Sequence, residues 1–144
     1  MKKLLYLLLG LLGFTSCEKL GPGECPVEYG CPTVDYIING VVTDEDGAPI
    51  KGIKIDAAGL YKPYDSETTE YVSGEDGSFV IERYRAGGIY GELLFTDVDG
   101  EENGGEFADS NVNVARFSKK QVEEGEGWYS GKYEVTAKVK LKKK

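Results

Sequence analysis

The stretch from Ile38 to Ile55, INGVVTDEDGAPIKGIKI, decides the fold of this chain. Apolar β-branched residues stand on both sides of its centre, and Ile53 and Ile55 alternate with Lys54. A period of two residues is typical of a strand with one buried and one solvated face. The centre, Asp44–Gly47, combines acids that can accept hydrogen bonds from nearby backbone N–H groups with a glycine that tolerates a positive φ. The stretch therefore predicts a strand, a tight turn and a second strand.

The rest of the chain continues this pattern. Gly74–Gly77 is a second turn signal, and Lys132–Lys142 alternates apolar with polar residues along its length. Lys119–Gly127 is charged and contains glycines, which predicts one helical turn or a loop. Seven strands separated by turns predict an all-β, immunoglobulin-like sandwich over residues 35–144. The expected strands are Tyr36–Thr43, Ile50–Ala57, Thr68–Ser73, Ser78–Tyr84, Ile89–Asp97, Asn111–Phe117 and Lys132–Lys142.

The beginning of the chain has the composition of a secretory leader. Lys2 and Lys3 provide a positive start, and the apolar run Leu4–Gly13 follows them. This run is too short to cross a bilayer, which needs about twenty apolar residues. The leader is therefore expected to direct export and not to span the membrane.

The leader ends in Phe14-Thr-Ser-Cys17, which resembles a bacterial lipobox. The resemblance implies that residues 1–16 are a lipoprotein signal peptide and that Cys17 carries the lipid. Residues 17–34 would then be a flexible tether between the lipid and the sandwich. The expected location is the bacterial cell envelope, as an outer-membrane lipoprotein that faces the periplasm or the surface. An ordinary cleaved leader with a free Cys17 is the alternative.

Composition narrows the range of functions. The net charge of −8 repels nucleic acid, so no nucleic-acid partner is expected. The chain contains no histidine, which removes the commonest general base and the commonest zinc ligand. On this inventory the chain is predicted not to be an enzyme.

Cys25 and Cys31 lie six residues apart in the expected tether. In an oxidising compartment a disulfide between them is the expected outcome. Free or otherwise modified thiols are the alternative. A metal site is disfavoured because two thiolates without further ligands do not complete one.

Oxygen-bearing side chains stand at alternate positions after the fifth expected strand, at Asp97, Asp99, Glu101 and Asn103. Calcium takes about six to eight oxygen ligands from a flexible loop, so this segment is a candidate calcium site. The spacing is not that of an EF-hand, since Gly100 falls at the fourth loop position and not the sixth. The alternative is a solvated loop whose acids keep one end of the domain polar. No other cofactor is expected.

Aromatic residues offer a second candidate surface. Tyr61, Tyr64, Tyr71, Trp128 and Tyr129 could together form a patch for glycans or peptides. The alternative is packing in the core or at the rim of the sandwich.

Turn and core positions between Asn39 and Phe95 resemble those of carboxypeptidase regulatory-like domains, including their opening hairpin. The resemblance implies a transthyretin-like β-sandwich and concerns the fold and not the activity. The positions that carry it are Gly40, Asp44, Gly47, Pro49, Gly52, Gly74–Gly77 and Phe79.

Four segments, Cys25–Tyr36, Gly40–Pro49, Asp97–Gly105 and Gly127–Tyr133, look like those of the radical SAM-associated lipoprotein family. This resemblance implies a non-catalytic envelope lipoprotein that is a partner or modification substrate of a radical SAM enzyme, or a partner of another envelope protein. The modified segment would be Cys25–Tyr36. The alternative function is a calcium- or glycan-binding accessory module of a surface uptake complex.

Overall fold

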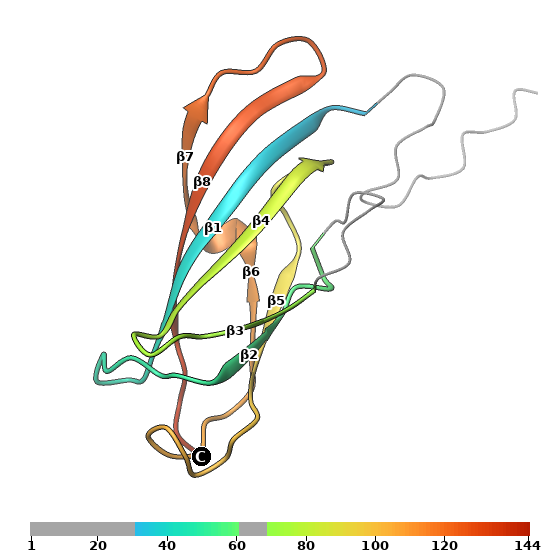
Figure 1. Cartoon of the computed structure of the whole chain (residues 1–144). Coiled ribbons are helices and arrows are strands. Elements are labelled where there is room, and N and C mark those ends of the chain that lie inside the picture. The colour runs from blue at the N-terminus through green and yellow to red at the C-terminus, as the bar shows by residue number, and fades with distance from the viewer. Residues whose placement is uncertain (1–30, 61–68) are drawn as a thin grey trace, which may run out of the picture.

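Two four-stranded sheets pack face to face in the part of the chain that the computed structural model describes, residues 31–60 and 69–144 (Figure 1). Sheet A has the strand order β4-β1-β8-β7, and sheet B has the order β3-β2-β5-β6. The predicted all-β sandwich is confirmed, with eight strands in place of seven. The elements are β1 (Thr33–Thr43), β2 (Ile53–Asp56), β3 (Glu70–Val72), β4 (Ser78–Ala86), β5 (Glu92–Asp97), β6 (Ser110–Asn113), the 3₁₀ helix η1 (Val114–Arg116), β7 (Ser118–Glu123) and β8 (Tyr129–Lys140).

Alternation builds the core between the sheets. Every second residue of β1 is buried, from Val34 to Val42, because successive side chains of a strand point to opposite faces. The rings of Phe79 in sheet A and Phe95 in sheet B meet edge to face with centroids 5.7 Å apart. Gly40 makes room for this contact, since a Cβ there would overlap the Phe79 ring. Burial of each phenylalanine contributes about 2 kcal/mol to the stability of the sandwich.

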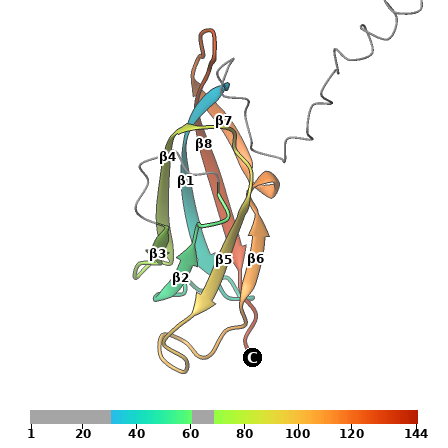
Figure 2. The ribbon, with the colours of Figure 1, turned by 90° about the vertical axis from the view of Figure 1, so that its right-hand side faces the viewer.

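The first and last strands lie side by side in the middle of sheet A. β1 pairs in parallel with β8, from Thr33 opposite Tyr129 to Thr43 opposite Lys140, and antiparallel with β4 on its other side. β4 and β3 form one edge of the sandwich, and β6 and β7 form the other (Figure 2). β1 begins at Thr33, two residues before the predicted start of the domain at residue 35.

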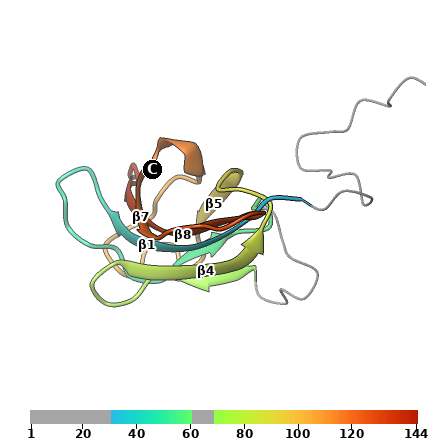
Figure 3. The ribbon, with the colours of Figure 1, turned by 90° about the horizontal axis from the view of Figure 1, so that it is seen from above.

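The stretch from Ile38 to Ile55 forms a corner between the two sheets. Its two predicted strands are present, and an antiparallel bridge between Thr43 and Pro49 begins the expected hairpin. The pairing does not continue, because β1 belongs to sheet A and β2 to sheet B (Figure 3). Asp44 organises the turn, since its Oδ1 accepts the N–H of Ala48 at 2.8 Å and its carbonyl accepts the N–H of Gly47 at 3.2 Å. Gly47 has a φ of 91°, which favours glycine.

Gly74–Gly77 makes the corresponding corner between β3 in sheet B and β4 in sheet A. The N–H of Gly77 donates to the carbonyl of Gly74 at 2.9 Å, as expected for a tight turn. Both strong turn signals of the sequence therefore lead the chain from one layer to the other.

The additional strand is β7, which occupies most of the predicted loop or helical turn at Lys119–Gly127. It pairs with β8 at the edge of sheet A, and all six of its residues are exposed. Because neither face of β7 is buried, its sequence has no apolar alternation from which a strand could be predicted. Its lysines, Lys119 and Lys120, are typical of an edge strand that resists pairing with other chains.

The predicted strand Asn111–Phe117 divides into β6 and η1. Asn113 explains the division, because its side chain accepts the N–H of Ala115 at 2.9 Å and thereby caps η1. No helix in residues 31–60 and 69–144 is long and apolar enough to cross a membrane.

Candidate functional site

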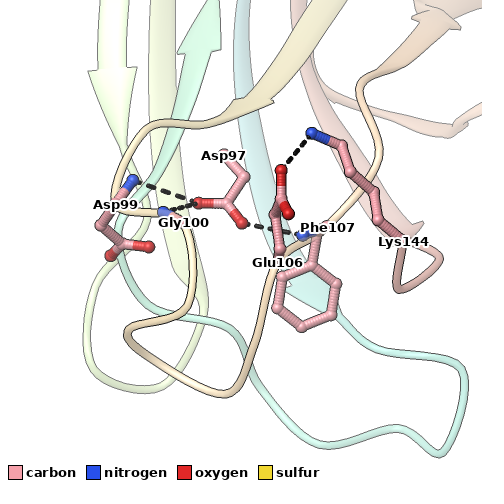
Figure 4. Close-up of polar contacts among 6 residues, drawn as sticks. All are labelled: Asp97, Asp99, Gly100, Glu106, Phe107 and Lys144. Atoms are coloured by element: carbon pink, nitrogen blue, oxygen red, sulfur yellow. Dashed lines mark hydrogen bonds and ion pairs between the residues drawn. The ribbon is translucent and has the colours of Figure 1, made fainter.

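The predicted calcium segment begins with Asp97, whose carboxylate is already engaged by the backbone (Figure 4). Its Oδ1 accepts the N–H groups of Asp99 and Gly100, both at 3.2 Å, and its Oδ2 accepts the N–H of Phe107 at 2.8 Å. Partial burial raises the pKa of Asp97, but the hydrogen bonds from Phe107, Asp99 and Gly100 outweigh burial and leave this pKa below its ordinary value. Asp97 therefore closes the loop and stays ionised.

The other predicted calcium ligands do not complete a metal site with Asp97, although the side chain of Asp99 lies within hydrogen-bonding reach of it. Asp99 accepts a hydrogen bond from the side-chain amide of Asn103, and Glu101 is exposed. Within the described ranges no three His, Cys, Asp or Glu side chains gather where they could hold a metal ion. Calcium binding by this segment stays a prediction, and the geometry assigns Asp97 to the structure of the loop.

The last two residues of the chain, Lys143 and Lys144, contact the end of the same loop. The ammonium of Lys144 lies 2.7 Å from the carboxylate of Glu106, and the N–H of Lys144 donates to the carbonyl of Glu106 at 2.9 Å (Figure 4). The ammonium of Lys143 lies 5.9 Å from the ring centroid of Phe107. Because Phe107 is buried, these contacts anchor the loop to the core.

The other predicted sites are separated or lie outside the described residues. Cys31 is disulfide-bonded, while Cys17 and the predicted partner Cys25 lie outside the described residues, so the pairing and the lipidation stay predictions. Tyr61 and Tyr64 also lie outside them. Two members of the predicted aromatic patch are apart, because Trp128 is exposed before β8 whereas Tyr71 packs against the core from β3 of the other sheet.

A polar cluster that the sequence did not predict is centred on two buried residues, Tyr36 and Arg83. We call these two residues, together with Tyr71 and the exposed Tyr90, the tyrosine–arginine cluster. Tyr36 on β1 and Arg83 on β4 are directly opposite each other in sheet A, and both are buried. Tyr71 comes from β3 in sheet B, and Tyr90 from the connection between β4 and β5. The cluster therefore joins the two sheets near the β3–β4 edge.

Arg83 is the centre of this cluster. Its side chain is 2% exposed, and its Nη1 donates to the hydroxyl of Tyr71 and to the carbonyl of Glu82, both at 2.9 Å. The guanidinium carbon lies 5.9 Å from the ring centroid of Tyr71, a cation–π distance. The Nε and Nη2 atoms of Arg83 are buried and have no hydrogen-bond partner among the described residues. One edge of a buried guanidinium is thus unpaired.

Tyr36 adds a second unpaired group, since its buried hydroxyl has no hydrogen-bond partner among the described residues. Burial raises the pKa of Tyr36 to about 12, although the nearby charge of Arg83 partly opposes the rise. Tyr90 and Tyr71 raise it further. At neutral pH the hydroxyl keeps its proton and is available as a donor.

A cavity of about 220 Å³ lies at the end of the sandwich where β1 begins, and neither Tyr36 nor Arg83 lines it. Val34, two residues before Tyr36, and Tyr133, the residue opposite Tyr36 on β8, both contribute to its wall. Gly87, Gly88 and Ile89, from the connection that also carries Tyr90, line another side. The cavity is therefore a neighbour of the cluster along the chain and not a part of it.

The sequence contained a signal for Arg83. Phe79, Ile81 and Arg83 are in phase with a period of two, so burial of the first two residues places Arg83 on the same inner face. The sequence reading placed Phe79 and Ile81 on one face without extending the phase to the arginine, because arginine is rarely buried.

Solved structures share this fold. The chain is similar to 3-chlorocatechol 1,2-dioxygenase from Rhodococcus opacus 1CP, with a TM-score of 0.51 and 15% identity over 88% of this chain and 67% of that chain. It is also similar to catechol 1,2-dioxygenase from Pseudomonas arvilla C-1, with a TM-score of 0.50 and 14% identity over 80% of this chain and 54% of that chain. This chain thus spans about half of the second enzyme. No protein-family model matches the sequence, and no curated protein matches it significantly.

These similarities correct the functional reading of the sequence. The chain was expected to be a non-catalytic lipoprotein serving a radical SAM enzyme, or else a calcium- or glycan-binding accessory module. Both of these solved structures are dioxygenases, so the similarity in fold does not support a non-catalytic role. The predicted non-catalytic function and the prediction that the chain is not an enzyme are therefore withdrawn. At 14–15% identity the similarity itself concerns the fold alone.

Proposed function

We propose that this chain binds a small anionic molecule between its two sheets, with Arg83 as the counter-ion. The observation that carries the proposal is the buried guanidinium of Arg83, whose Nε and Nη2 have no partner among the described residues. An unpaired charge inside a protein costs several kcal/mol, so stability does not explain an arginine at this position. A bound anion would supply the missing charge and the missing acceptors.

Comparison with the other buried polar side chain supports this proposal. Besides the tyrosines, Ser73 and Arg83 are the polar residues buried in the described part of the chain. The hydroxyl of Ser73 donates to the carbonyl of Ile50 at 2.8 Å and accepts the N–H of Ile53 at 3.0 Å. A satisfied polar group is the normal state inside a protein, and Arg83 departs from it.

The distribution of acids also supports it. The chain has 25 acidic residues, yet the three ion pairs in its described part involve Lys51, Lys54 and Lys144. The carboxylate of Glu82, which precedes Arg83, accepts the hydroxyl of Tyr84 at 3.0 Å on the exposed side of β4. Among the described residues no carboxylate is paired with the buried arginine, which is consistent with an anion from outside.

Thermal unfolding of the purified full-length protein in detergent tests the proposal. An anion at about a hundred times its Kd stabilises a protein by about 2.7 kcal/mol, which for a domain of this size raises Tm by about 10 °C. A panel of chloride, sulfate, phosphate, acetate and benzoate is compared at constant ionic strength. Arg83→Met is expected to abolish the shift, whereas Arg116→Met, at an exposed arginine of η1, retains it. If no anion raises Tm, the proposal fails.

We further propose that the sandwich is anchored in the bacterial envelope by a lipid on Cys17. The leader pattern in residues 1–16 supports this location, as does the disulfide at Cys31, since disulfides persist in oxidising compartments. A tether over residues 17–32 would reach at most about 55 Å, which keeps the sandwich close to the membrane.

Membrane fractionation tests the anchor. The natural protein is expected in the detergent phase, and Cys17→Ser is expected to move it to the aqueous phase. Cys25→Ser is the matched control and should leave the protein in the detergent phase. A Cys17→Ser protein that stays in the detergent phase would argue against a lipid on this residue.

A further inference from the structure

We propose that the anion is a carboxylate, bound side-on by the Nε–Nη2 edge of Arg83 with the Tyr36 hydroxyl as a third donor. This inference rests on the anion binding proposed above and names the chemical class of the ligand. Nothing in the fold similarity assigns it. It follows from which atoms of the cluster are already paired and which are not.

The pairing of Arg83 leaves one particular edge available. A guanidinium carries five N–H donors in a planar fork. Nη1 uses its two donors on the hydroxyl of Tyr71 and the carbonyl of Glu82. Nε and Nη2 remain, and their N–H bonds run parallel along the opposite edge. This is the edge that matches the two oxygens of a carboxylate, so it favours a bidentate contact.

The existing contacts also hold this edge in place. Nη1 is bonded across to sheet B through Tyr71 and back to its own strand through Glu82, which restricts rotation of the guanidinium. The guanidinium carbon also lies over the ring of Tyr71, 5.9 Å from its centroid. A donor pair that is already oriented loses little entropy when a ligand binds.

Tyr36 provides the additional donor. Its ring lies on the same inner face as Arg83, directly opposite in the sheet, and its hydroxyl is unpaired. Because its pKa is about 12, the hydroxyl is protonated at neutral pH and can donate to an anionic oxygen. Residues directly opposite each other in an antiparallel pair have Cβ atoms about 4.5–5.5 Å apart, which brings the side chains of Tyr36 and Arg83 close together.

The number of donors selects among anions. The described part of the site offers one bidentate edge, one further N–H of Nη2, one hydroxyl and a single positive charge. A planar monoanion can use all of these, because its two oxygens together accept about four hydrogen bonds. Sulfate or phosphate would bury oxygens without donors, and each unsatisfied polar group costs about 1–3 kcal/mol. A halide is a single atom, so it cannot accept parallel hydrogen bonds from both Nε and Nη2 as the two oxygens of a carboxylate do.

The surroundings favour an acid with an apolar body. Arg83 is enclosed by the ring of Tyr71, and Tyr90 lies close enough to Tyr36 to influence its pKa. Ala86 and Ile89, which follow Arg83, belong to or pack against the hydrophobic core. The ligand class is therefore a small organic acid with an apolar body, for which benzoate is a suitable probe.

The test is a titration of the full-length protein with benzoate, followed by the ¹⁵Nε resonance of Arg83 and by calorimetry. Benzoate is expected to move this resonance and to bind, while uncharged benzamide does neither. Arg83→Lys keeps the charge and removes the fork, and is expected to weaken benzoate binding at least tenfold. Tyr36→Phe is expected to weaken it about fivefold, and Arg116→Lys to leave it unchanged.

The outcomes separate this inference from the proposed function. If sulfate or phosphate binds through Arg83 more tightly than benzoate and acetate, the cluster is an anion site but not a carboxylate site. If Arg83→Lys binds benzoate as well as the natural protein, the side-on contact is wrong, although anion binding stands. If no anion moves the Arg83 resonance, both proposals are wrong.

Discussion

The loop at Asp97 and the tyrosine–arginine cluster both contain a charged side chain, but the two side chains differ in how fully they are hydrogen-bonded. Asp97 lies near the surface, and both of its oxygens accept backbone N–H groups. Arg83 is buried, and two of its nitrogens have no hydrogen-bond partner in the part of the chain that the structure describes. The loop was a candidate site in the sequence because acids are dense there, whereas the cluster was not, apart from Tyr71 in the predicted aromatic patch.

The difference shows that the density of polar residues is a poor guide to function in this fold. A polar group that the chain itself satisfies contributes to stability. A buried polar group that the chain does not satisfy reduces stability, and its retention calls for another explanation. The predictions below test whether the two regions respond to mutation with opposite signs.

The largest expected effect is at Asp97. Replacing it with alanine removes the acceptor of three backbone N–H groups, so Asp97→Ala is expected to lower the free energy of unfolding by about 3 kcal/mol. Urea denaturation of both proteins at pH 7 measures the change. Asp99→Ala is the matched control within the same loop and should cost clearly less. Equal losses from the two substitutions would mean that Asp97 has no special role.

The same carboxylate predicts acid sensitivity. The pKa of Asp97 is lower in the folded protein than its ordinary value, so its contribution is present above the unfolded pKa of about 3.9 and is lost as the pH falls through the folded pKa. Denaturation at pH 6 and at pH 3 measures this loss. Asp97→Asn should lose less stability over that interval than the natural protein does. An identical loss would show that other acids control it.

The opposite sign is expected at Arg83. Methionine fills a similar volume without burying a charge, so Arg83→Met is expected to raise the free energy of unfolding by about 2 kcal/mol in the absence of ligand. Denaturation in a buffer free of carboxylates measures the change. Destabilisation by a similar amount would contradict the picture of an unpaired arginine, since it would mean that the guanidinium is satisfied in the ligand-free protein.

A smaller effect is expected at Tyr36. Tyr36→Phe removes a buried hydroxyl without a partner, which should stabilise the protein by about 1 kcal/mol at pH 7. The pKa of Tyr36 is about 12 in the folded protein and about 10 in an unfolded chain, so stability from the neutral hydroxyl is lost as the pH rises from 10 to 12. The difference in the free energy of unfolding between Tyr36→Phe and the natural protein should therefore increase between pH 7 and pH 11. A constant difference would refute the burial of this hydroxyl.

The smallest effect is expected at Glu101. Its side chain is exposed, so Glu101→Gln should change the free energy of unfolding by less than about 0.5 kcal/mol. The same variant tests the calcium prediction by calorimetry. If the natural protein binds calcium and Glu101→Gln does not, the loop is a metal site. The loop would then have a binding function and not only a structural one.

Much of the fold followed from local pattern, and its exceptions have physical causes. The long alternation of Lys132–Lys142 predicted β8, and the turn at Asp44–Gly47 predicted the end of β1. β7 escaped prediction because it is exposed on both faces. The corner at Asp44–Gly47 read as a hairpin because a turn motif specifies the local backbone, while the destination of the next strand depends on the whole core.

The candidate site was less predictable. Its members, Tyr36, Tyr71, Arg83 and Tyr90, come from three strands and one connection. The alternation of residues along β4 is enough to identify its inner face. The pairing of Arg83 with Tyr71, in contrast, depends on how the two sheets pack together. The missing partners at Nε and Nη2 are a property of the assembled interior. No single segment of the sequence contains this information.

The parallel pairing of β1 with β8 has a consequence for the timing of folding. The centre of sheet A joins the first described strand to the last, so it is incomplete until the C-terminal residues are available. Contacts so distant along the chain form slowly. A chain that ends before Tyr129 should therefore remain unfolded, whatever the quality of its other strands. For an exported chain, this delay would keep the polypeptide free to pass through a narrow channel before it folds.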